Sequence, residues 1–165
     1  NLDQYYLFKK RSTLNSKMET FGPEYQHRFG STYIDRKVIT KKNVIFAGLG
    51  GSLRYNDGEN QYTEFQMTLR MLSLVPKLLW NRLVHGRFLD ILVTHVPPCG
   101  IHDKDDVTHR GFSGFLWFMR TFRPRYLLHG HIHLYDLNER RVTRYWDTVV
   151  INVYDHYVLE LDTDG

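Results

Sequence analysis

The sequence has few of the residues that would fix its location or divide it into parts. Cys99 is the single cysteine among 165 residues, which excludes an internal disulfide and suits a reducing compartment. Five prolines are scattered along the chain, and no repeat, low-complexity tract or linker interrupts it. No apolar run reaches the roughly 18 residues that a membrane-spanning helix needs. We therefore expect a cytoplasmic protein with no membrane partner.

The remaining composition is that of an ordinary folded domain. Hydrophobic residues make up 42% and aromatic residues 15% of the chain, which is enough for a sizeable core in 19.7 kDa. The net charge of +4 and the pI near 9.2 favour anionic partners without identifying them. Phosphorylated small molecules fit this charge, and so does nucleic acid. Because no helix-turn-helix, zinc-finger or RNA-binding signature is present, nucleic-acid binding rests on charge alone.

Apolar runs that are typical of strands alternate with segments of helical spacing, which predicts an α/β fold. The expected β-structure comprises buried strands at 44–47, 91–94 and 126–129, later strands at 148–153 and 158–161, and a hairpin pairing 31–34 with 37–40 around Asp35-Arg36. The glycines of 48–51 follow the first buried strand. They lack the pattern of a phosphate-binding loop, so we expect a tight turn there.

Three helices are predicted between these strands. The first begins at Thr63 and aligns Phe65, Leu69 and Leu72 along one face. The second begins at Pro76 and ends at Gly86. The third covers 112–122, where aromatic residues at helical spacing are expected to pack into the core.

Two of the buried strands end in histidines, and this is the most informative feature of the chain. Residues 91–94 lead into His95, and residues 126–128 lead into His129, His131 and His133. Chemistry gathers in the loops that leave the carboxyl ends of parallel strands. Neutral imidazole is a common ligand of transition metals, and Gly130 is expected to let the chain turn before His131. The pattern therefore predicts a metal site.

The two segments are VTHVPP and LLHGHIH, and their order carries a resemblance. THxPP followed about 35 residues later by GHIH resembles the last two motifs of the calcineurin-like metallophosphoesterases. The stretches AGLGGSLRYNDGENQYTEFQM and VVINVYDHYVLELD are similar to one bacterial-type subset, so the resemblance spans most of 43–162. It implies two facing mixed β-sheets flanked by helices. It also implies hydrolysis of a phosphomonoester or phosphodiester with two divalent ions, which could be Mn, Fe, Zn or Ni.

The family's upstream motifs, Asp-x-His and Gly-Asp, are not found before His95. We therefore interpret residues 1–165 as the C-terminal part of one metallophosphoesterase domain, with the N-terminal half missing. Asn1-Leu2-Asp3 resembles the remains of a third motif. The resemblance then implies that Asn1, His95 and His131 hold one metal ion and that His133 reaches the other. We further expect Asp3 and His129 to lie next to these ligands and to orient them without contacting the metal ions.

Leu2 departs from the family, in which a histidine at this position helps to protonate the leaving group. This departure leaves open a catalytically impaired metal-binding domain of the same fold, with a regulatory or interaction role. The loop that carries His102, Asp103, Asp105, Asp106 and His109 has two open interpretations. It is either a lid that touches substrate or a polar surface loop. We select Asp103 and His109 as the candidate catalytic residues, and we expect no catalytic role for Cys99.

Overall fold

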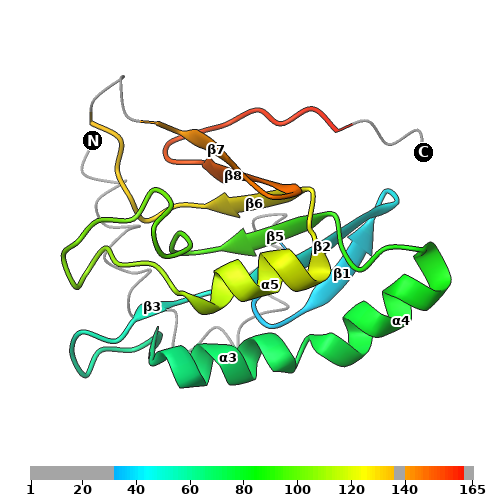
Figure 1. Cartoon of the computed structure of the whole chain (residues 1–165), viewed down its shortest axis with the longest axis horizontal. Helices are drawn as coiled ribbons and strands as arrows, with labels where there is room; N and C mark the ends of the chain where they lie inside the picture. The colour runs from blue at the N-terminus through cyan, green and yellow to red at the C-terminus, as the bar shows by residue number, and fades with distance from the viewer. Residues whose placement is uncertain (1–31, 136–139, 162–165) are drawn as a thin grey trace.

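The computed structural model describes residues 32–135 and 140–161, which form an α/β fold around one mixed sheet (Figure 1). The sheet has six strands in the order β1-β2-β5-β6-β8-β7. Strands β2, β5, β6 and β8 are parallel, and β1 and β7 pair antiparallel at the two edges. The strand bounds are Val38–Lys41 (β1), Val44–Leu49 (β2), Ile91–Thr94 (β5), Tyr126–His129 (β6), Val142–Tyr145 (β7) and Thr148–Asn152 (β8).

A second sheet in the described residues consists of two short parallel strands, β3 (Ser52–Leu53) and β4 (Gln61–Tyr62). The predicted α/β class is therefore confirmed. The two facing sheets that the family resemblance implies are not established by residues 32–135 and 140–161. None of the helices in that part of the chain is long and apolar enough to cross a membrane.

The predicted strands at 44–47, 91–94, 126–129 and 148–153 are confirmed as β2, β5, β6 and β8, but two predictions of β-structure are wrong. The hairpin joins β1 to β2 through Lys42 and Asn43, which both adopt left-handed backbone angles, and does not pair 31–34 with 37–40. Asp35 and Arg36 do form a turn, closed by the Lys37 amide donating to the Ile34 carbonyl. Residues 158–161 form no strand. The partner of β8 is β7, and Trp146 takes the left-handed position of their turn.

The three predicted helices are present as α3 (Glu64–Leu72), α4 (Val75–His85) and α5 (Gly114–Phe122). Thr63 caps α3 by accepting the Gln66 amide, and the Gln66 side chain accepts the Thr63 amide in return. Gly86 ends α4 with a left-handed φ of 72°. The predicted face of α3 points outward, since Phe65 is 70% exposed and Leu69 is 51% exposed. Met67 and Met71 are the buried residues of this helix.

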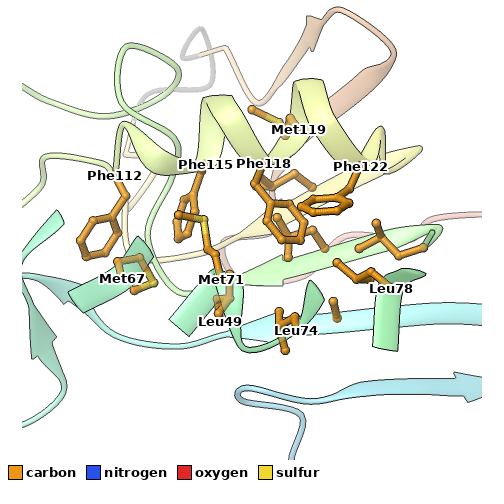
Figure 2. Close-up of a cluster of buried hydrophobic side chains, with 14 of the residues drawn as sticks. Leu49, Met67, Met71, Leu74, Leu78, Phe112, Phe115, Phe118, Met119 and Phe122 are labelled. Atoms are coloured by element: carbon orange, nitrogen blue, oxygen red, sulfur yellow. The ribbon is translucent and has the colours of Figure 1, made fainter. Parts of the chain in front are cut away.

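All three helices pack on one face of the large sheet. Figure 2 shows Phe115, Phe118 and Phe122 of α5 directed toward the residues of α3 and α4 beneath them. The same cluster includes alternate residues of the sheet, among them Ile45 and Leu92, which point toward the helices. A phenylalanine of this kind stabilises the fold by roughly 1.5 to 3 kcal/mol through burial. This core fixes the sheet and therefore the edge at which its parallel strands end.

Candidate functional site

The candidate site lies at the carboxyl edge of adjacent parallel strands. Thr94 of β5 is paired with His129 of β6, so the residues that follow each strand emerge side by side. The rings of His95 and His131 come together there, with their centres 4.8 Å apart and their planes at 60°. The fold thus brings these two predicted ligands together, because parallel strands deliver both to the same edge, and their role as metal ligands stays a prediction.

His95 is well prepared to act as a ligand. Part of its side chain is exposed to solvent, yet desolvation of the remainder and the neighbouring His131 lower its pKa. The ring is therefore neutral near pH 7, which is the form that binds metals. Neither ring nitrogen of His95 has a hydrogen-bond partner among the described residues, so either nitrogen is free to carry the lone pair that binds a metal ion.

His131 is held in a more constrained way. Its Nε2 lies 2.8 Å from the Thr108 carbonyl oxygen. A carbonyl can only accept, so Nε2 carries the proton and Nδ1 keeps the free lone pair. Its φ of 66° is left-handed, which costs energy for a residue with a Cβ. The expected turn at Gly130 is therefore made by His131 itself, and backbone strain marks this position.

The two imidazoles fit part of a metal site. A tetrahedral ion about 2.1 Å from each nitrogen would set two ring centres roughly 5 Å apart, close to the spacing of His95 and His131. Within residues 32–135 and 140–161, however, no group of three or more histidine, cysteine, aspartate or glutamate side chains is arranged to hold a metal ion by itself. A complete site requires further donors. Asn1, Leu2 and Asp3 lie outside the described residues.

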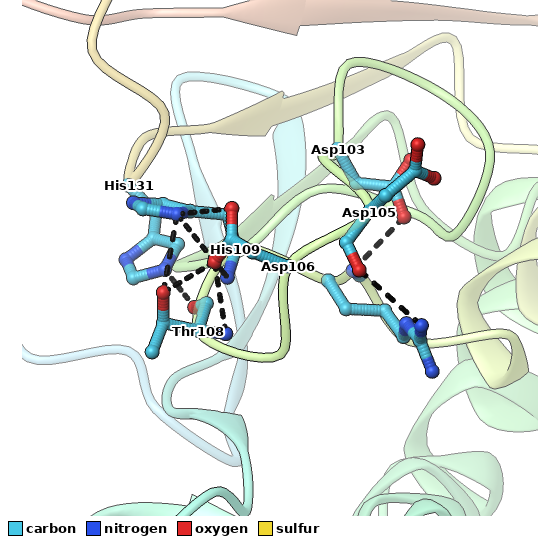
Figure 3. A network of polar contacts seen from close by, with 8 residues as sticks. Asp103, Asp105, Asp106, Thr108, His109 and His131 are labelled. Atoms are coloured by element: carbon cyan, nitrogen blue, oxygen red, sulfur yellow. Dashed lines mark hydrogen bonds and ion pairs between the residues drawn. The ribbon is translucent and has the colours of Figure 1, made fainter.

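His109 joins this pair from the loop between β5 and α5. Its ring centre is 5.3 Å from that of His131, and its Nδ1 lies 2.8 Å and 2.9 Å from the two carboxylate oxygens of Asp106 (Figure 3). Hydrogen bonds from Thr108 and His109 lower the pKa of Asp106 to about 2, so its carboxylate is ionised. An ionised carboxylate that accepts from Nδ1 fixes the orientation and the tautomer of the imidazole, which leaves Nε2 free to exchange a proton.

Asp106 is the loop carboxylate that contacts His109, whereas the sequence interpretation selected Asp103 as a catalytic candidate. The spacing of Asp106 three residues before His109 was the available signal. Asp103 lies in the same loop, where its carboxylate oxygens accept the Gly100 and Gly111 amides at 2.9 Å and 3.1 Å, and its catalytic assignment stays a prediction. The ends of this loop are tied where the Cys99 amide donates to the Phe112 carbonyl.

His133 does not meet the other two predicted ligands in the described residues. Its ring stacks on Tyr154 with centres 4.6 Å apart, and its Nδ1 lies 2.9 Å from the Tyr135 hydroxyl. The side chain is exposed. The contacts of the His133 side chain differ from those of His131, which suits a role at a second metal ion. The assignment of His133 as a ligand stays a prediction.

His129 is fully buried beneath the site and belongs to a chain of hydrogen bonds. Its Nδ1 lies 3.0 Å from the Gly130 carbonyl, and its Nε2 lies 2.9 Å from Nδ1 of His102. Nε2 of His102 is 2.8 Å from the Thr143 hydroxyl. Burial lowers the pKa of His129 to about 4, and burial and then the charge of Arg140 lower the pKa of His102. Both rings are therefore neutral at pH 7.

Asn152 supports the histidine loop from the next parallel strand. It is fully buried, donates its side-chain amide to the Ile132 carbonyl at 2.9 Å, and accepts the Tyr154 amide at 2.9 Å. The bond to Ile132 holds the backbone between His131 and His133. Sequence reasoning did not single out Asn152, although a buried amide at the end of a predicted strand was a usable signal.

No protein-family model matches the chain. An uncharacterized protein of Methanocaldococcus jannaschii, MJ1162, is 32% identical over 127 residues, which are 72% of this chain and 52% of that protein. One solved structure, 15% identical, has a TM-score of 0.54 and matches 81% of this chain and 50% of its own. The protein TT1561 of Thermus thermophilus is 13% identical with a TM-score of 0.47, over 74% of this chain and 49% of its own.

The chain thus spans about half the length of the proteins it matches. The match with a TM-score of 0.54 shows a shared α/β fold and nothing about activity.

Proposed function

We propose that this chain is the part of a calcineurin-like metallophosphoesterase domain that carries the last two metal-binding motifs, and that the intact protein hydrolyses a phosphoester. The observation that supports this most is the meeting of His95, His131 and His109 at the carboxyl edge of β5 and β6. Two of the three histidines that the motif resemblance selects, His95 and His131, are among those that the fold brings together. Two bound divalent ions (Mn, Fe, Zn or Ni) would supply Lewis-acid polarisation of the phosphate and a water nucleophile near neutral pH.

The chain's own residues divide the remaining work. His95 offers two ring nitrogens that no described residue engages, and His131 offers Nδ1 because its Nε2 donates to Thr108. His109, held by the ionised Asp106, delivers a proton to the leaving group through Nε2. This assignment gives His109 the role that Leu2 cannot fill. The phosphorylated substrate is attracted by the net positive charge of the chain.

The same proposal includes a second sheet facing the first. Helices cover the sheet face that bears Ile45, Leu92 and Leu127. The opposite face carries Phe46, Val93 and Leu128, which are only half buried. Apolar side chains on both faces are typical of a sheet that is covered on both sides. A further layer on that face would complete the two-sheet sandwich that the family resemblance implies.

The test is hydrolysis of 4-nitrophenyl phosphate by the intact protein supplied with Mn²⁺ or Zn²⁺. We expect metal-dependent turnover that His131→Ala abolishes. His85→Ala is the matched control, since His85 is exposed in the last turn of α4, away from the site, and should leave turnover unchanged. Metal binding without turnover in the unsubstituted protein would favour the impaired, regulatory alternative. Turnover that survives His131→Ala would contradict the assignment.

A further inference from the structure

A cavity of about 380 Å³ opens beside the candidate site and shares a wall with it. Ile132 lines this cavity and is also the residue between His131 and His133, so the cavity borders the histidine loop. The cavity falls within the roughly 300 to 1,000 Å³ that small-molecule sites occupy. Its size and position suit a part of a substrate whose phosphate lies at the histidines.

The charged side chains of the cavity are mostly cationic. Lys104 and Arg140 line it, and neither side chain has a hydrogen bond or ion pair with any described residue. Asp103 also lines it, but both of its oxygens already accept backbone amides. The cavity wall therefore carries two cations without a partner among the described residues and one carboxylate whose oxygens already accept hydrogen bonds. A ligand group that binds here by hydrogen bonds to these cations must be an acceptor. A negative charge on that group strengthens the hydrogen bonds.

The other walls are partly apolar and partly held by hydrogen bonds. Ile132 is buried and Leu134 is half buried, which lowers the local dielectric and strengthens a charge-assisted bond. His102 and Thr143 also line the cavity, and they are hydrogen-bonded to each other. The Gly130 carbonyl requires the proton on Nδ1 of His129, so Nδ1 of His102 must donate to His129 and Nε2 of His102 must accept from Thr143. The part of the wall formed by His102 and Thr143 is therefore held in place by hydrogen bonds before a ligand enters.

We propose that this cavity binds an acidic group on the organic part of the substrate, so that the preferred substrate is a phosphoester with a second anionic group on an apolar body. Lys104 and Arg140 bind the second anion, and Ile132 and Leu134 contact the apolar body. The inference rests on the proposed phosphoesterase function, because that function places the phosphate at the histidines. Its chemistry is general: a carboxylate or a second phosphate satisfies the same two cations.

Two uncleavable probes test the proposal in the intact protein. 4-Carboxybenzylphosphonate carries both anionic ends, and benzylphosphonate lacks the carboxylate. Titration calorimetry with Mn²⁺ present should show tighter binding of the carboxylated probe by roughly 10- to 100-fold, the scale of a charge-assisted hydrogen bond. Arg140→Gln should remove most of that preference and leave benzylphosphonate binding within about twofold. Arg120→Gln, an exposed arginine of α5, is the matched control and should change neither affinity.

Hydrolysis of 4-nitrophenyl phosphate, measured in parallel, separates the two claims. Turnover without a preference for the carboxylated probe overturns the cavity inference and leaves the phosphoesterase intact. A preference that depends on Arg140 in a protein without turnover supports the cavity and counts against the proposed reaction. A preference that persists in Arg140→Gln and in Lys104→Gln also overturns the inference, because the second anion is then bound elsewhere.

Discussion

Nε2 of His129 accepts a hydrogen bond from Nδ1 of His102 at 2.9 Å, and this contact joins the fully buried end of β6 to the loop that follows β5. Only one proton arrangement satisfies both rings, because the Gly130 carbonyl holds the proton of His129 on Nδ1. Protonation of His129 would place two donors face to face in a buried space. The contact between His102 and His129 beneath the candidate site therefore requires both imidazoles to be neutral.

This relationship predicts an acid-sensitive fold. The pKa of His129 is about 4 in the folded chain and 6.5 without burial, so the unfolded chain binds the extra proton first. The free energy of unfolding should fall as pH decreases from about 6.5 to about 4, by on the order of 3 kcal/mol, and this contribution should level off below that range. Urea denaturation at several pH values measures it.

His129→Gln is the control for that measurement. It should be less stable at pH 7, because a buried hydrogen bond changes, but its stability should depend less on pH between 6.5 and 4. An unchanged pH dependence would assign the effect to other groups. The lowered pKa of His102 acts in the same direction, so a smaller residual slope is expected.

Asp106 gives a second prediction, which concerns catalysis. Asp106→Asn removes the carboxylate that orients His109 through its Nδ1. We expect turnover of phosphoesters with poor leaving groups to drop by roughly 10- to 100-fold, a usual scale for positioned acid catalysis, with a smaller loss on nitrophenyl esters. Metal content should stay the same. Steady-state kinetics on phenyl and 4-nitrophenyl phosphate provide the comparison.

Asp105→Asn is the matched control, since Asp105 is exposed in the same loop and contacts Arg110 through its backbone carbonyl. Equal losses in the two variants would mean that general loop charge, and not the Asp106–His109 pair, is responsible.

Alanine substitutions at two glycines near the site, Gly111 and Gly130, should have different effects on the stability of the fold. A Cβ at Gly111 would overlap the Pro97 carbonyl and lie 2.6 Å from the Pro98 carbonyl carbon, both of them backbone atoms that cannot yield cheaply. A Cβ at Gly130 would meet only the His95 carbonyl at 4.0 Å. Gly111→Ala should therefore lower the melting temperature by several degrees, and Gly130→Ala should be nearly neutral. Differential scanning calorimetry distinguishes them, and equal shifts would contradict this packing.

The sequence predicted the parallel core of the fold because buried strands and amphipathic helices leave strong periodic signals. It failed where local pattern and tertiary packing disagree. Residues 31–40 alternate like a hairpin, yet Lys42 and Asn43 provide the left-handed angles that pair β1 with β2. The apolar face of α3 with Phe65 and Leu69 looked like a core face, yet the flexible Met67 and Met71 fill the space under α5.

The part of the candidate site that lies at the ends of the strands could be predicted from the sequence. His95 and His131 follow neighbouring parallel strands, so their meeting follows from topology. The roles within the 102–109 loop could not be obtained in this way. Both Asp103 and Asp106 lie near His109 in the sequence, and beyond the three-residue spacing of Asp106 it is the contacts that show Asp103 accepting loop amides and Asp106 holding His109.

The metal content of the intact protein tests the central claim most directly. Inductively coupled plasma mass spectrometry, after growth with Mn²⁺ and Zn²⁺ and extensive dialysis, should find about two divalent ions per chain in the unsubstituted protein. His95→Ala and His131→Ala should each retain clearly less, while His85→Ala should retain the full amount. Absence of metal from the unsubstituted protein, or equal metal in His95→Ala and His85→Ala, would contradict the account.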